Sequence, residues 1–129
     1  MHVKSHLWIA VVVLGSIVVG ACAGPSGQAA AAFPAGVYKP AQKLYADQLT
    51  FGEDGRYQIT VGTWQIHGSY AVDGTKIVLT NEDTAECRDY PGTYGWEARG
   101  NELTLKAIED TCTGSDREKD LSRSWVLQP

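Results

Sequence analysis

The chain has few of the residues that usually perform chemistry in small proteins. Its 129 residues include three histidines and three cysteines, and they contain neither a C-x-x-C pair nor an EF-hand spacing. His67 is the only histidine beyond the N-terminal segment, and no serine and aspartate partners for it are evident. A Ser-His-Asp triad and haem ligation therefore have little support, and an Asp or Glu acid-base pair is the catalytic arrangement left open. We expect no enzymatic activity, no cofactor and no resident metal ion.

An excess of basic residues is also missing. The formal net charge is -4, and it becomes -5 if residues 1–21 are removed, because Lys4 is the only charged side chain among them. Proteins that bind nucleic acid through its phosphates carry a concentration of Lys and Arg. We therefore exclude nucleic acid as a partner. The length and composition are those of one small globular domain.

No apolar run is long enough to span a bilayer. The uncharged stretch Leu7–Val19 falls short of the roughly 20 residues that a transmembrane helix requires. It follows Lys4 and ends in Val19-Gly20-Ala21-Cys22. A positive start, a short apolar centre and small residues before a cleavage point are typical of a secretory signal. The ending also resembles the bacterial lipobox, whose cysteine is acylated before the peptide is cut in front of it.

This resemblance implies a signal peptide over 1–21 and a lipid on Cys22, which would leave that cysteine no free thiol. Two acyl chains give stable membrane anchoring without a further segment. The location would be extracytoplasmic, and in a Gram-negative host the absence of Asp after Cys22 would direct the protein to the outer membrane. Two alternatives remain open: cleavage at Ala21-Cys22-Ala23 into a free secreted protein, and retention of the uncleaved run as an anchor.

Two further segments follow the predicted signal. Residues 22–33 are small, mostly uncharged and without periodicity, as expected of a flexible linker. Residues 34–129 alternate apolar and polar side chains in short runs separated by turn residues, which predicts an all-β domain. The expected strands are Gly36–Lys39, Asp47–Phe51, Arg56–Val61, Gln65–Val72, Lys76–Thr80, Gly92–Ala98, Glu102–Ile108 and Arg123–Gln128.

About eight strands without helices to cover them favour closure into a small up-and-down antiparallel β-barrel. The tight turns at Asp54-Gly55, Asp73-Gly74 and Arg99-Gly100 would all lie at one end, and the longer loops at the other. A β-sandwich is the main alternative, but the run of adjacent hairpins favours the barrel. Such a barrel is filled by its own side chains or holds one small ligand.

Cys87 and Cys112 are predicted to form a disulfide. If the chain between them folds as a hairpin about Arg99-Gly100, the two cysteines lie opposite each other. Exported proteins meet oxidising conditions, which favours a bridge over the alternatives of a redox pair or metal ligands. With Cys22 acylated and this pair bridged, no nucleophilic thiol would remain.

Short motifs of the domain resemble those of small bacterial lipocalin-like proteins, of the calycin type. These motifs are Gly36-x-Tyr38 at the start, repeated Gly-x-Tyr segments before tight turns, and Arg123-x-Trp125 at the end. The resemblance implies a barrel that binds a small apolar or amphipathic molecule. It also implies that Arg123 packs across the ring of Tyr38. The chain departs from the family in having Tyr instead of Trp at position 38 and no C-terminal helix.

Side chains at the loop-rich end suggest two kinds of site. Trp64, Tyr94 and Trp125 are predicted to lie towards that end, where they could form a ligand-binding rim, although a plain core is favoured over a rim because inward aromatics usually fill a small barrel. The acidic loops around 82–89 and 109–120 suggest either a Ca²⁺ site or solvated acids partly paired with basic residues. We predict solvated acids because the EF-hand spacing is lacking.

Two functions therefore compete. In the first, a membrane-anchored lipoprotein binds a small apolar or amphipathic ligand within its barrel. In the second, a filled barrel binds a protein, as an envelope component or as an inhibitor of an extracellular hydrolase, with the acidic loops suited to a basic partner such as a lysozyme-like enzyme. The resemblance favours the first function, and a packed interior would favour the second.

Overall fold

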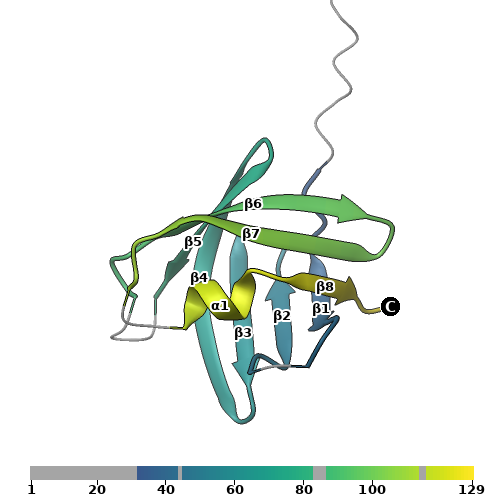
Figure 1. The fold of residues 1–129 in the computed structure, drawn as a ribbon, viewed down its shortest axis with the longest axis horizontal. Coiled ribbons are helices and arrows are strands. Elements are labelled where there is room, and N and C mark those ends of the chain that lie inside the picture. The colour runs from purple at the N-terminus through teal and green to yellow at the C-terminus, as the bar shows by residue number, and fades with distance from the viewer. Residues whose placement is uncertain (1–31, 44, 83–86, 114–115) are drawn as a thin grey trace, which may run out of the picture.

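The chain forms one closed antiparallel barrel of eight strands in sequence order (Figure 1). The computed structural model describes residues 32–43, 45–82, 87–113 and 116–129. Each strand pairs with the next, and the last returns to the first. The elements are β1 (Gly36–Pro40), β2 (Gln48–Phe51), β3 (Arg56–Val61), β4 (Trp64–Asp73), β5 (Lys76–Asn81), β6 (Gly92–Arg99), β7 (Glu102–Asp110), α1 (Arg117–Leu121) and β8 (Ser124–Leu127). The prediction of an all-β, up-and-down barrel is confirmed.

The two ends of the barrel differ, as the positions of the turns predicted. Connections 52–55, 74–75 and 100–101 form what we call the turn end, and connections 41–47, 62–63, 82–91 and 111–123 form the loop end. Gly55, Gly74 and Gly100 adopt φ of 78°, 58° and 59°, which glycine reaches without the strain that a side chain would introduce. Because β1 begins beside the 52–55 turn, the chain enters the barrel at the turn end.

The inward faces of the strands fill the barrel. Alternation along β3 and β5 places Tyr57, Ile59, Ile77 and Leu79 inside, each at most 3% exposed. Phe33, the last residue of the predicted linker, packs against the turn end, with ring centroids 4.9 Å from Phe51 and 5.2 Å from Trp96. Aromatic burial of this kind contributes strongly to the core of a small domain. The described residues include no helix that is long and apolar enough to cross a membrane.

The hairpin between β6 and β7 has a different register from the one we predicted. Arg99 pairs with Glu102 and Trp96 with Leu105, so the turn residues are Gly100 and Asn101 instead of Arg99 and Gly100. Glycine stands at the first central position with φ of 59°, as in a type II′ hairpin turn. A further register shift lies between Thr93 and Tyr94. The prediction treated Arg99-Gly100 as the two-residue turn and did not anticipate this irregularity.

The disulfide predicted from that register is nevertheless present. Cys87 and Cys112 are bridged, with their Cα atoms 5.2 Å apart. Both cysteines lie outside the paired strands, Cys87 before β6 and Cys112 after β7. Their meeting therefore depends on how the flanking segments leave the hairpin. Cys87 adopts φ of 64°, the only positive value among the described residues other than glycine.

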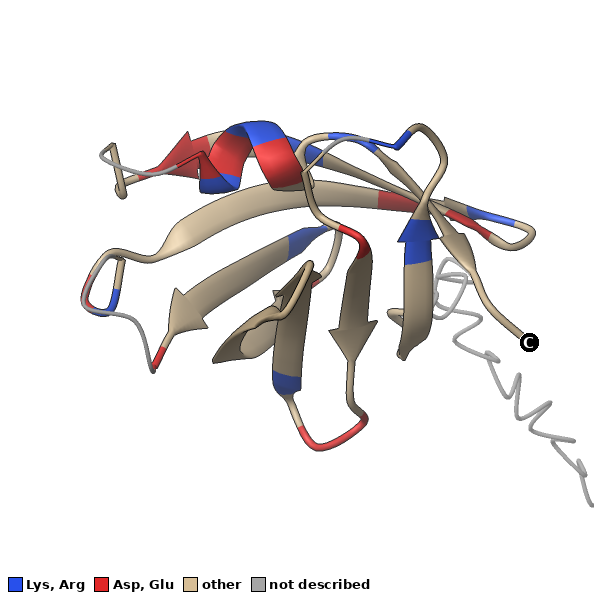
Figure 2. Cartoon of the chain, turned by 90° about the horizontal axis from the view of Figure 1, so that it is seen from below, with Lys and Arg blue, Asp and Glu red and all other residues tan. Residues whose placement is uncertain are grey.

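A short helix, α1, lies in a segment that we predicted to be a polar loop. It spans Arg117–Leu121 and lies beside β7, and Figure 2 shows it as a succession of blue and red positions. Leu121 is its only apolar residue and has no exposed surface. Five residues with a single apolar position carry no detectable helical period, which is why the sequence pattern missed it. The indole N–H of Trp125 donates a hydrogen bond to the Leu121 carbonyl at 3.3 Å.

Candidate functional site

The structure does not bring the three predicted rim residues together at an open site. Tyr94 and Trp125 are wholly buried, at 0% exposure, whereas Trp64 is 78% exposed. Trp64 lies where β4 pairs only with β3, because pairing of β4 with β5 begins at Gly68. Its side chain therefore extends past the barrel wall. The three residues do not share a cavity.

The large inward side chains leave no open space beside them. A side chain lining a ligand cavity borders that cavity and therefore retains accessible surface. The large side chains with less than 2% exposure are Trp125, Tyr38, Tyr94, Phe51, Leu49, Ile77, Leu79, Leu103, Leu105 and Leu121. These residues come from β1, β2 and β5–β8 and from α1. The barrel interior around them is packed like a protein core.

An ion pair between Arg117 and Asp110 is buried at the centre of a polar cluster. The two side chains are 3% and 1% exposed. Arg117 donates from Nε to Asp110 Oδ2 at 2.8 Å and from Nη2 to Asp110 Oδ1 at 2.5 Å. This two-point geometry matches the planar guanidinium to the carboxylate. Asp110, which we predicted to be a solvated loop residue, instead ends β7 inside the protein.

Further hydrogen bonds join this pair to four other segments. Arg117 donates to Asn81 Oδ1 at 3.3 Å and to the Tyr90 carbonyl at 2.6 Å. Tyr94 donates its hydroxyl proton to Asp110, and Tyr57 donates to Asn81. We call Tyr57, Asn81, Tyr94, Asp110 and Arg117 the Arg117 cluster. The cluster links β3, β5, β6, β7 and α1, so the geometry supports a structural role at the loop end.

Two neighbours fit closely around Asp110. The backbone N–H of Cys112 donates to Asp110 Oδ1 at 3.0 Å, which ties the disulfide to the cluster. Gly92 pairs with Asp110, and a Cβ at Gly92 would lie 2.7 Å from Asp110 Oδ2. Only glycine leaves room for the carboxylate at this position.

The cluster fixes the protonation state of its members. Burial by itself would raise the pKa of Asp110, but hydrogen bonds from Arg117 and Tyr94 favour the carboxylate and outweigh it, so the pKa lies below its usual value. Burial raises the pKa of Tyr94, and its hydrogen bond to Asp110 raises that pKa further. Tyr94 therefore remains a neutral donor and Asp110 a charged acceptor.

The depressed pKa of Asp110 predicts a specific loss of stability in acid. Its stabilising contribution is complete above the unfolded-state pKa of about 4 and is lost as the pH falls through the lower pKa of the folded state. We expect the difference in urea midpoint between the wild type and Asp110→Asn to be largest near neutral pH and to shrink below pH ~4. A constant difference in urea midpoint between the wild type and Asp110→Asn, from neutral pH down into strong acid, would contradict this prediction.

Arg123 packs on a different ring from the one expected. The lipocalin-like resemblance implied contact with Tyr38, but the Arg123 guanidinium carbon lies 5.9 Å from the centroid of the Trp125 ring. That distance is within the range of a cation–π contact. Tyr38 instead donates its hydroxyl proton to the Pro34 carbonyl at 2.5 Å. Arg123 and Trp125 therefore pack against each other at the start of β8.

The two most exposed large aromatic side chains lie at the loop end. Tyr45 is 74% exposed and Trp64 is 78% exposed. The chain segments that carry them are held together by Asp47, whose N–H donates to the Thr60 carbonyl at 2.8 Å and whose Oδ2 accepts from the Gly62 N–H at 2.6 Å. We call Tyr45 and Trp64 the exposed aromatic pair.

The predicted acidic sites have no metal-binding geometry in the part of the chain that the structure describes. No group of three His, Cys, Asp or Glu side chains there is arranged to hold a metal ion. Among the loop acids, Asp116 pairs with Lys119 at 3.1 Å, and Glu82 pairs with Arg56 at 2.6 Å. Residues 83–86, which include two of the predicted acids, lie outside the described residues, as does Cys22. His67 lies on β4 opposite Gln58.

Comparison with known proteins adds no assignment, because no family profile, curated protein or solved structure matches this chain.

Sequence reasoning missed the Arg117 cluster and the exposed Tyr45. One signal was available: inward tyrosines at positions 57 and 94 require hydrogen-bond partners once buried. The sequence held no such signal for Arg117, because a basic residue in an acidic loop is expected to be solvated.

Proposed function

We propose that this protein is an extracytoplasmic lipoprotein, anchored through Cys22, whose filled barrel binds a protein through its loop end. The observation that carries this proposal is the complete burial of Tyr94 and Trp125 in a packed interior. A barrel filled by its own side chains must act through its outer surface. The packed interior favours protein binding over the small-ligand function suggested by the lipocalin-like resemblance.

The exposed aromatic pair is the part of that surface best suited to a protein contact. Tyrosine and tryptophan are over-represented among the residues that dominate binding energy at protein interfaces. Both side chains are about three-quarters exposed, so the free protein derives little packing energy from them. The Asp47 hydrogen bonds hold their backbone segments in place before any partner arrives. Such preorganisation lowers the entropic cost of binding.

The start of β1 and the proposed surface lie at opposite ends of the domain. The chain enters β1 at the turn end, and the exposed aromatic pair lies at the loop end. A lipid on Cys22 would therefore hold the turn end towards the membrane and leave the loop end accessible. Lipid attachment itself rests on the residues Val19-Gly20-Ala21-Cys22.

Site-specific photo-crosslinking in cells of the source organism tests this proposal. A photoreactive amino acid at position 64 should yield an adduct larger by the mass of a protein, because Trp64 would lie inside the interface. The same probe at Lys106, an exposed residue of β7, is the matched control and should yield no such adduct. Trp64→Ala should keep the thermal midpoint of the wild type, since the side chain is mostly exposed.

Adducts of equal yield at positions 64 and 106 would show non-specific contact and would count against the proposal. An adduct of only a few hundred daltons at position 64 would instead support a small-molecule site. Tyr45→Ala supplies an independent check, because it should reduce the yield at position 64 without altering the fold.

A further inference from the structure

The hairpin of β3 and β4 has an open strand edge at the loop end. β4 pairs with β3 from Trp64 onwards, but its pairing with β5 begins only at Gly68. Glu82, which follows β5, adds one bond by donating its N–H to the His67 carbonyl at 3.0 Å. Among the residues that the structure describes, Trp64–Ile66 therefore have a neighbouring strand on one side only. Figure 1 shows the tip of this hairpin projecting at the bottom of the view.

The main chain of Gln65 points to that open side. Successive residues of an antiparallel strand direct their N–H and C=O groups alternately to the two neighbouring strands. On β4, the Tyr70 N–H donates to the Gly55 carbonyl on the β3 side at 2.8 Å, whereas the His67 carbonyl accepts on the β5 side. Odd-numbered residues thus face β5, and the pairing of β4 with β3 has no register shift. Gln65 directs its N–H and C=O to the side where β5 has ended, and neither group has a partner among the described residues.

Other open edges of the barrel carry charged side chains. At the turn end β4 extends beyond β3, and there Asp73 lies opposite Lys76. β6 extends beyond β5, and there Glu97 and Arg99 form an ion pair at 2.6 Å. Charges at an edge discourage pairing with another chain. The segment Gly62–Ile66 contains neither a charged residue nor a proline, so the loop-end edge lacks this protection.

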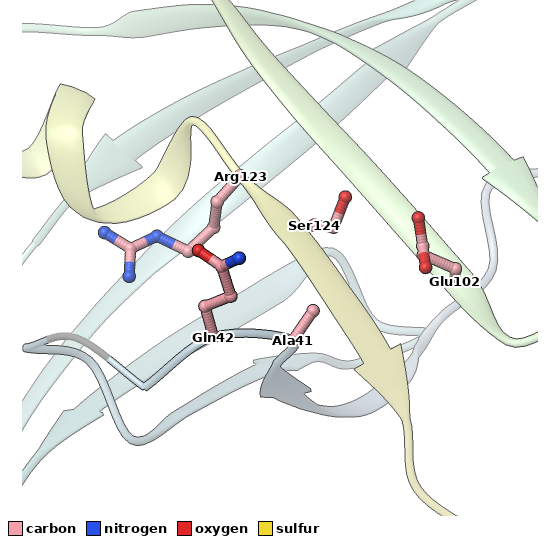
Figure 3. Close-up of a pocket in the computed structure, with 5 residues that line it drawn as sticks. All are labelled: Ala41, Gln42, Glu102, Arg123 and Ser124. Atoms are coloured by element: carbon pink, nitrogen blue, oxygen red, sulfur yellow. The ribbon is translucent and has the colours of Figure 1, made fainter.

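The seam between β1 and β8 shows how an edge is closed elsewhere in the barrel. Ala41 follows β1, and its N–H donates to the Ser124 carbonyl at 3.0 Å, so pairing continues past the last residue of the strand. Both residues line a pocket on the outside of the barrel (Figure 3). Their paired main-chain groups are already used within the fold, in contrast to those of Gln65.

An apolar face lies beside the open edge. Trp64 and Ile66 project from the same face of β4, because they are two residues apart. They lie opposite Val61 and Ile59 of β3. Residues 62–65 are all exposed, and the Trp64 side chain is 78% exposed. A strand added beside β4 would place every second side chain next to Trp64 and Ile66, in the cross-strand positions that stabilise a sheet.

We propose that the protein partner binds by strand addition, with an extended segment that carries apolar side chains at alternate positions and pairs with β4 at Gln65. This inference rests on the proposed function, because it assigns the way in which the loop end holds a protein. The residue opposite Gln65 would exchange two main-chain hydrogen bonds with it, and the residues on either side would pack on Trp64 and Ile66. Main-chain bonds supply affinity in such complexes, and the alternate side chains supply specificity.

Amide hydrogen exchange of the full-length protein, held in a non-ionic detergent, tests whether the edge is open. The Gln65 amide should exchange rapidly, because its N–H faces the open side. The Ile66 amide faces β3, where Ile66 pairs with Ile59, and should exchange about tenfold more slowly. A Gln65 amide as protected as that of Ile66 would show that the edge is already occupied within the chain and would overturn the proposal.

Gln65→Pro tests the pairing itself, because it removes the N–H that the added strand would use. Proline is tolerated in a strand where the N–H faces solvent, so the thermal midpoint should stay close to that of Gln65→Ala. With a photoreactive amino acid at position 45, Gln65→Pro should lower the yield of protein adduct in cells about tenfold, whereas Gln65→Ala, which keeps the N–H, should not. Val72→Pro is the matched control, since Val72 lies on β4 beyond the end of β3 and its N–H faces that open side.

The outcomes separate this inference from the proposed function. A protein adduct at position 45 whose yield is the same with and without Gln65→Pro would overturn strand addition but leave protein binding at the loop end intact. An equal loss with Val72→Pro would also overturn it, because that substitution lies outside the proposed contact. If chains that carry only the photoreactive residue, at position 45 or 64, give no protein adduct, the proposed function fails and strand addition fails with it.

Discussion

Asp110→Ala should lower the free energy of unfolding by about 3–5 kcal/mol, the usual cost of removing one partner from a buried ion pair. The substitution leaves the Arg117 guanidinium, whose side chain is 3% exposed, without its main acceptor. It also removes the acceptor of the Tyr94 hydroxyl and of the Cys112 N–H. A domain of this size has a total stability of about 5–15 kcal/mol, so the variant would be close to unfolding. Urea denaturation followed by tryptophan fluorescence measures the change.

An exposed pair provides the matched control for this experiment. Glu97 and Arg99 are bridged at 2.6 Å, but their side chains are 61% and 83% exposed. Removing Glu97 should change stability by less than about 1 kcal/mol, because exposed ion pairs contribute little. A similar loss for Asp110→Ala and Glu97→Ala would show that burial does not govern the Arg117 cluster.

The double variant Asp110→Ala with Arg117→Met separates the buried charge from the lost contacts. If the unpaired guanidinium causes most of the loss, removing it should restore part of the stability, and the double variant should be more stable than Asp110→Ala alone. If the loss of stability in the double variant instead equals the sum of the losses in the two single variants, the effect comes from packing and from the bonds with Tyr90 and Asn81. Equal denaturant slopes for the two variants would allow their urea midpoints to be compared directly.

The strand pattern of this chain was readable because it depends on local alternation. Inward positions such as Ile59, Leu79 and Leu103 recur every second residue, and this period is set by the geometry of each strand alone. The same pattern placed Tyr94 and Trp125 on the inner face, although it did not decide whether they lined a cavity or filled a core. That outcome depends on the summed volume of side chains from every strand.

Features that depend on contacts between residues far apart in the sequence could not be predicted. The partners of Arg117 come from residues 81, 90 and 110, and only the closed barrel brings them together. Trp64 shares the parity of the inward residues, yet it is exposed because β4 extends beyond the first residue that pairs with β5. Strand lengths and the shear of the barrel decide such positions. The predicted β6–β7 register was wrong at the turn itself, because Gly100 and Asn101 form the turn instead of Arg99 and Gly100, and the shift at Thr93/Tyr94 changes the pairing further.

Replacing both bridged cysteines, Cys87→Ser with Cys112→Ser, should lower the free energy of unfolding by about 3.5 kcal/mol in the chain-entropy estimate. The bridge joins positions separated by 25 residues, so its loss frees a long loop in the unfolded chain. The two cysteines are 3% and 7% exposed, so the serines would also have to be accommodated in a buried site. Urea midpoints of the oxidised wild type, the reduced wild type and the double variant measure the effect, and the last two should both lie below the first.

The loss should be coupled to the Arg117 cluster because the bridge and the cluster hold the same segments. Cys112 donates to Asp110, and Arg117 binds the carbonyl of Tyr90, three residues after Cys87. Once either restraint is removed, the other one acts on a segment that is already less well held. The stability loss of a variant that combines the disulfide change with Asp110→Ala should therefore differ from the sum of the two separate losses by more than about 0.5 kcal/mol. Amide exchange should quicken in residues 87–91 and in α1 for both variants. Strictly additive penalties, with exchange unchanged in α1 when the bridge is absent, would show that the bridge stabilises the chain only through the unfolded state.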